Sequence, residues 1–157
     1  KGPVYLRFGR PKVPIFIPEN TPFEIGKALT IQEGTDVTIF ATGHLVWEAV
    51  EAAKVLSNEG YSVELINIHT IKPLDDECIL SSVAKTKCVV TAEEHQIAGG
   101  MGESIAKLLA NNSPTPMEFV AVNDKFGESG KPADLMKKYG LHSSNIVDAT
   151  HRVLKRK

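Results

Sequence analysis

The chain has 157 residues, of which 42% are hydrophobic, and this length and composition suit one globular domain with its own core. Its 18 basic and 19 acidic residues leave a net charge of -1, so the charge balance favours neither nucleic acid nor an anionic membrane surface as a partner. Cys78 and Cys88 lack the spacing of a metal site or disulfide framework, and no signal peptide or long apolar span appears. We therefore expect reduced thiols in a cytoplasmic protein.

The first 24 residues are rich in proline and are interpreted as a connector. Five of the nine prolines lie here, a density that disfavours helices and central strands. The chain does not begin with Met and runs directly into the strand-like segment Val4–Phe8, so we expect it to be part of something larger. We interpret residues 1–24 as the end of a preceding domain with a linker, and residues 25–157 as the domain proper.

The first two apolar runs of the domain are Ala28–Ile31 and Val37–Ala41. Only Gln32–Asp36 separates them, which is too short for the crossover that parallel pairing needs. We therefore predict that these two strands pair antiparallel. From Leu45 the apolar residues recur at helical spacing until Gly60, which predicts a covering helix.

Strand and helix patterns alternate along the rest of the chain. Strands are predicted over 63–68, 88–92 and 117–122. Helices are predicted after Pro73, after the glycine turn at 99–102, over 132–139 and over 144–154. Ser143 or Ser144 is expected to cap the last helix. This alternation predicts a three-layer α/β/α fold with a mostly parallel five-stranded sheet and one antiparallel edge strand.

The glycine turn Gly99–Gly102 joins a predicted strand to a predicted helix, where unpaired backbone amides can bind an anion. Its spacing is neither GxGxxG nor a P-loop, so close packing of strand against helix is the favoured interpretation. Just before it, Glu93, Glu94 and His95 are either an acid/base cluster at a strand end or a polar surface that another domain covers. The residues alone leave that choice open.

Arg7 and Arg10 lie in the extended, proline-bounded segment. A guanidinium group suits bidentate binding of carboxylate or phosphate, but on pattern alone surface arginines in a linker are favoured. The five histidines show no metal-binding spacing, and no serine lies in a GxSxG elbow.

Five segments, taken in order, carry a family resemblance: residues 2–11 (GPVYLRFGRP), 68–75 (IHTIKPLD), 93–103 (EEHQIAGGMGE), 126–132 (FGESGKP) and 139–141 (YGL). Together they resemble the C-terminal domain of transketolases over nearly the whole chain. Ser129 and Gly130 favour transketolase over two sibling families. Those families, the deoxyxylulose-phosphate synthases and the β subunits of 2-oxoacid dehydrogenases, are kept as alternatives.

The resemblance implies a parent enzyme, a homodimer or an assembly of split subunits, that transfers a two-carbon ketol unit between sugar phosphates in the pentose phosphate pathway. Thiamine diphosphate and Mg²⁺ would be bound by other domains, residues 1–24 would end the pyrimidine-binding domain, and this chain alone would be inactive. It also implies that Arg10 contacts the phosphate of the sugar, although Gly9 stands where serine is common. We expect no catalytic residue and no cofactor or metal ligand in this chain.

Two hypotheses of another kind remain open. The chain could be a purely structural module for assembly with the remaining transketolase domains or an N-terminal subunit. Alternatively, it could be a regulatory module that binds an anion at Gly99–Gly102.

Overall fold

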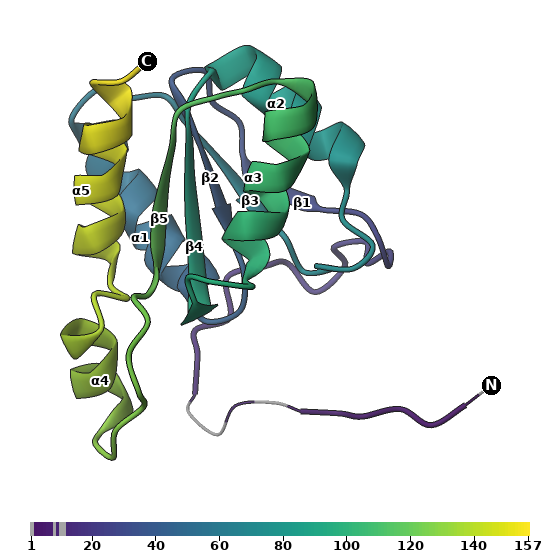
Figure 1. Cartoon of the computed structure of the whole chain (residues 1–157), viewed down its shortest axis with the longest axis vertical. Helices are drawn as coiled ribbons and strands as arrows, with labels where there is room; N and C mark the ends of the chain where they lie inside the picture. Colours follow the sequence, from purple (N-terminus) through teal and green to yellow (C-terminus); the bar gives the residue numbers. More distant parts are fainter. Residues whose placement is uncertain (1, 8, 10–11) are drawn as a thin grey trace.

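A computed structural model describes residues 2–7, 9 and 12–157 (Figure 1). Its strands are β1 (Leu29–Gln32), β2 (Val37–Ala41), β3 (Val63–Asn67), β4 (Val89–Gln96) and β5 (Met117–Val122). Its helices are α1 (Leu45–Asn58), α2 (Asp76–Thr86), α3 (Met101–Asn112), α4 (Pro132–Lys138) and α5 (Ser143–Leu154). No helix in the described part of the chain is long and apolar enough to cross a membrane.

The five strands form one sheet in the order β1-β3-β2-β4-β5. β2 runs parallel to both of its neighbours, β4 runs parallel to β5, and β1 runs antiparallel to β3 at the edge. Helices α1 and α5 pack on one face, and α2 and α3 pack on the other. The predicted three-layer α/β/α fold with one antiparallel edge strand is therefore confirmed.

The predicted pairing of β1 with β2 is wrong, because β1 pairs with β3. All five residues of β2 are buried, so this strand takes the centre of the sheet, while the half-buried β1 lies at the edge. The connection between them passes against the start of β3, where the amides of Thr35 and Asp36 donate to the carbonyl of Ser62 at 3.1 and 2.8 Å. The two strands do run in opposite directions, with β3 between them.

Side chains of β2 alternate between the two halves of the core. Val37, Ile39 and Ala41 join the cluster under α1 and α5, whereas Phe40 joins the cluster under α2 and α3. Thr38 is buried on the α2 side, where its hydroxyl lies 2.8 Å from Ser82 Oγ and 2.6 Å from Thr86 Oγ1. The hydroxyl groups thus satisfy one another inside the core.

Two helix starts are fixed by side chains from elsewhere in the fold. Asp75 caps α2 by accepting from Cys78 N at 3.2 Å, and it also accepts from Ala28 N at 2.9 Å, which connects α2 to the start of β1. For α5 the predicted serine cap is wrong, because Ser143 is the first helical residue. The N-cap residue is His142, whose Nδ1 accepts from Ser144 N at 3.4 Å, and the N–H of Ser143 donates to Glu48 Oε2 on α1 at 2.7 Å.

Gly34 allows the connection between β1 and β2 to pass β3. A Cβ at this position would overlap the backbone of Val63 and Glu64, which are held in the sheet. We predict that Gly34→Ala lowers the free energy of unfolding by about 2 to 3 kcal/mol, measured by urea denaturation. Gly127→Ala is the matched control, since a Cβ at residue 127 meets nothing within 4 Å, and we expect a change within about 0.5 kcal/mol. Equal losses would contradict the steric argument.

Both thiols are shielded by the fold. Burial, aided by the Asp75 and Glu64 carboxylates, raises the pKa of Cys78 to about 11, and burial also raises the pKa of Cys88. Because the thiolate is the reactive form, we predict that at pH 8 iodoacetamide labels Cys78 about 100-fold more slowly in the folded chain than in the urea-unfolded chain, and that it labels Cys88 more slowly as well. The rate for Cys78 should rise with pH up to about 11. Labelling of the folded chain at the unfolded rate would refute this.

Candidate functional site at the carboxyl end of the sheet

The order of the strands defines a switch point between β2 and β4. From β2 the chain continues to β3 on one side, and it later returns to β4 on the other. Open α/β sheets bind ligands in the crevice outside the carboxyl ends of the strands at such a point. A cleft of about 1140 Å³ lies there, lined by residues that follow β2, by the end of β4, by the start of α3, by α4 and by the linker. We call it the carboxyl-end cleft.

Glu93 occupies the place where an anion would be expected to bind. Its side chain is buried, with 2% of the residue exposed, and it points from β4 to the first turn of α3. Oε2 accepts from Met101 N at 2.7 Å and Oε1 accepts from Gly102 N at 2.8 Å. The helix-start amides that a phosphate would need are therefore already bonded to an internal carboxylate.

The glycines of the turn make this arrangement possible. Gly99 has φ of 76°, a conformation that favours glycine. A Cβ at Gly100 would lie 2.5 Å from Glu93 Oε2, and one at Gly102 would lie 2.7 Å from Thr91 Oγ1. Close packing of strand and helix, the favoured interpretation, accounts for Gly100 and Gly102, and the positive φ of the turn accounts for Gly99.

The structure separates the three residues of the candidate acid/base cluster. Glu93 is buried beneath α3, whereas Glu94 and His95 are exposed. Glu94 Oε2 lies 2.8 Å from Nδ1 of His44, which precedes α1, so this pair joins the two sides of the switch point. The Nδ1 atom of His95 lies 2.9 Å from the carbonyl oxygen of Gln96. The three side chains do not converge on one reacting position.

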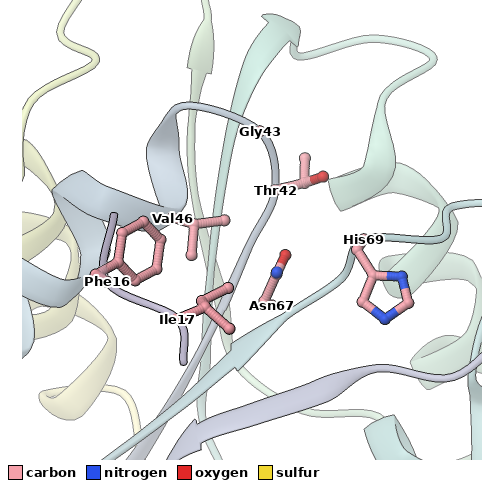
Figure 2. A pocket seen from close by; sticks show the side chains of 7 residues that line it. All are labelled: Phe16, Ile17, Thr42, Gly43, Val46, Asn67 and His69. Atoms are coloured by element: carbon pink, nitrogen blue, oxygen red, sulfur yellow. The ribbon is translucent and has the colours of Figure 1, made fainter. Parts of the chain in front are cut away.

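A smaller pocket of about 420 Å³ lies beside the carboxyl ends of β2 and β3, where the linker closes one side (Figure 2). Its lining residues are Phe16, Ile17, Thr42, Gly43, Val46, Asn67 and His69. The Phe16 ring packs on Trp47 of α1 with centroids 5.5 Å apart. The Phe23 ring packs on His69 at 4.6 Å. The sequence did not predict these two ring contacts. The signal for them was the presence of Phe16 and Phe23 in a proline-rich segment.

Of the two linker arginines, Arg7 belongs to the described part of the chain and Arg10 does not. Arg10 lies outside the described residues, so its predicted contact with a sugar phosphate stays a prediction. Arg7 is described and lines the carboxyl-end cleft together with Lys12. His44 and Trp47, which the sequence did not single out as site residues, line the same cleft. Their positions follow from the switch point, which becomes visible only once the strand order is known.

The parallel sheet, its helical layers and the cleft at the switch point define an open α/β domain. Within that class, residues 26–146 match the family model described as transketolase, C-terminal domain, and the chain belongs to this family.

Over 156 residues the chain is 46% identical to a 6-deoxy-6-sulfo-D-fructose transketolase subunit from Clostridium sp. (strain MSTE9), covering 99% of this chain and 48% of that protein. It is 37% identical over 148 residues to a 1-deoxy-D-xylulose-5-phosphate synthase from Caldanaerobacter subterraneus subsp. tengcongensis, covering 93% of this chain and 24% of that protein. A solved structure described as split gene transketolase, inactive beta4 tetramer, matches with a TM-score of 0.88 and 40% identity, covering 91% of this chain and 47% of that one. The chain thus spans about half the length, or less, of these relatives.

The bonds to α3 predict a specific stability effect. In Glu93→Gln one donor amide of the helix faces an NH2 group instead of an oxygen, and the charge is lost. We expect the free energy of unfolding to fall by about 2 to 3 kcal/mol, measured by urea denaturation. The matched control is Glu94→Gln, an exposed neighbour for which a change within about 0.5 kcal/mol is expected. Similar values for the two variants would show that Glu93 does not hold the helix start.

Proposed function

We propose that this chain is the C-terminal part of a transketolase-type enzyme that transfers a two-carbon ketol unit between sugar phosphates. The observation that carries the proposal is the match to a transketolase subunit at 46% identity over 99% of the chain. Residues 1–24 are then the end of the pyrimidine-binding domain with a linker, and residues 25–157 are the C-terminal domain. The match to the family model from residue 26 supports this division.

The cofactor of such an enzyme belongs on other parts of the parent protein. The family implies thiamine diphosphate with Mg²⁺, but the described residues of this chain do not fit that group. They include no cluster of three or more His, Cys, Asp or Glu that could hold a metal ion, and Glu93 takes the helix-start amides that a diphosphate would use. In this proposal the chain is inactive alone and acts by completing the assembly of a cytoplasmic enzyme.

The proposed contact of this chain with substrate is made by Arg10. Its guanidinium group would bind the terminal oxyanion of the sugar bidentately at the entrance of the active site. A charge-assisted contact of this kind contributes on the order of 1.5 to 3 kcal/mol. The sugars of the pentose phosphate pathway carry such a phosphate, and this pathway is the role we propose.

A second candidate substrate is favoured by one observation. The relative from Clostridium is named for 6-deoxy-6-sulfo-D-fructose, a sugar whose terminal anion is a sulfonate instead of a phosphate. The planar fork of Arg10 suits either oxyanion, so the same residue would serve both substrates. The match to a deoxyxylulose-phosphate synthase keeps that sibling reaction as an alternative for the parent enzyme.

In the complete enzyme, Arg10→Ala should raise KM for sugar phosphates about 10- to 100-fold, the equivalent of the lost contact, and leave unphosphorylated ketol donors nearly unchanged. Steady-state kinetics with both donor types measures this. Arg10→Lys keeps the positive charge but lacks the planar guanidinium group, so its KM for sugar phosphates should lie between those of the wild type and Arg10→Ala. Running the same series with a 6-sulfo sugar identifies the preferred anion. Equal effects of Arg10→Ala on all donors would refute the oxyanion contact.

A further inference from the structure

The smaller pocket, of about 420 Å³, has two sides of different chemistry (Figure 2). One side consists of three apolar side chains from the linker and α1, namely Phe16, Ile17 and Val46. The other side consists of three polar side chains at the carboxyl ends of β2 and β3, namely Thr42, Asn67 and His69. A cavity of this volume has room for one small molecule, since ligand sites begin at about 300 Å³.

The polar side has hydrogen-bonding capacity that the fold does not use. Within the described part of the chain, the Thr42 hydroxyl and the Asn67 amide have no hydrogen-bond partner, and neither is among the buried unpaired atoms, so both are open to the pocket. The Nδ1 atom of His69 lies 3.1 Å from Thr70 Oγ1, which leaves Nε2 as its second ring nitrogen. A hydroxyl, an amide and an imidazole offer both donors and acceptors to a ligand.

Both sides of the pocket are held in place. Ala41 of β2 lies opposite Asn67 of β3 in the parallel register, so the sheet fixes Asn67 beside the residue that precedes Thr42. The Thr42 N–H also donates to the carbonyl of Ala92 on β4 at 3.1 Å. On the linker side, the ring of Phe16 packs on Trp47. The polar groups are therefore positioned before a ligand arrives, which lowers the entropic cost of binding.

The lining restricts the chemistry of the ligand. None of the described residues that line the pocket is Asp, Glu, Lys or Arg, so an anion such as a sugar phosphate would lose hydration without meeting an opposite charge. An uncharged sugar carries hydroxyls around its ring, and those on the apolar side would stay unpaired. A flat nitrogen heterocycle has apolar faces and a polar edge, which matches both sides of the pocket.

We propose that this pocket binds an uncharged nitrogen heterocycle of the purine type. Its faces pack against Phe16, Ile17 and Val46, and its polar edge bonds to Thr42 and Asn67. An asparagine amide presents a donor beside an acceptor, which pairs with the neighbouring acceptor and donor on the edge of adenine. A free base and the base of a nucleoside share this chemistry, and the experiment distinguishes them. The proposal does not depend on the proposed function.

An NMR titration of the 157-residue chain with adenine, adenosine and ribose tests the proposal. With adenine we expect saturable shifts of the amide signals of Ile17, Thr42 and Asn67, with a dissociation constant of about 1 mM or below. Ribose should produce no saturable shift. Adenosine binding at least as tightly as adenine identifies a nucleoside as the ligand, whereas weaker binding identifies the free base.

Two variants test the polar edge. Thr42→Val has nearly the same shape without the hydroxyl, and Asn67→Leu removes the amide, so each should weaken adenine binding about 5- to 10-fold. Thr30→Val is the matched control, because Thr30 is exposed on β1 and does not line the pocket, and it should leave the affinity unchanged.

Three results would overturn the proposal: no saturable shift at the three amides, equal shifts with ribose, or unchanged adenine affinity in both pocket variants. Any of them leaves the proposed function intact, since ketol transfer by the complete enzyme is measured separately. Conversely, adenine binding that depends on Thr42 and Asn67 upholds this inference even if the parent enzyme transfers no ketol unit.

Discussion

The carboxylate of Glu93, held between β4 and the first turn of α3, is the interaction on which the carboxyl end of the sheet depends. A buried carboxylate costs several kcal/mol unless its oxygens are bonded. Here each oxygen accepts one backbone N–H of α3, at 2.7 and 2.8 Å, and the helix dipole adds to the attraction. The close approach leaves no room for a Cβ at Gly100. Strand, turn and helix are therefore one unit.

This unit shapes what the cleft above it can do. A switch point in an open α/β sheet is ordinarily a ligand site, and the start of a helix supplies its anion-binding amides. In this chain the first amides of α3 already donate to the Glu93 carboxylate. The edge of the cleft carries apolar groups and a linker that packs on Trp47. The cleft thus lies where a ligand site would be expected, but its helix-start amides are already bonded to Glu93. This arrangement is compatible with the proposed role of the chain as a part that completes an enzyme assembly.

The regular part of the fold could be predicted because periodicity and turn residues act locally. The position of β1 could not, since a short connection restricts the direction of two strands and not whether a third lies between them. Likewise Glu93 and Glu94 are adjacent acidic residues, and only the pleat of β4 decides which one is buried. The first amide of α5 donates to Glu48, a residue on α1 that no local pattern connects to Ser143. Long-range contacts of this kind determine the geometry of the site, and local sequence patterns do not predict them.

The saturation of the α3 amides is tested most directly by an NMR titration of the 157-residue chain with inorganic phosphate and ribose 5-phosphate. If Glu93 fills the helix start, the amide signals of Gly100, Met101 and Gly102 show no saturable change up to millimolar ligand. Saturable shifts of these three amides would contradict the account, because they would show that an external anion reaches the site that Glu93 occupies.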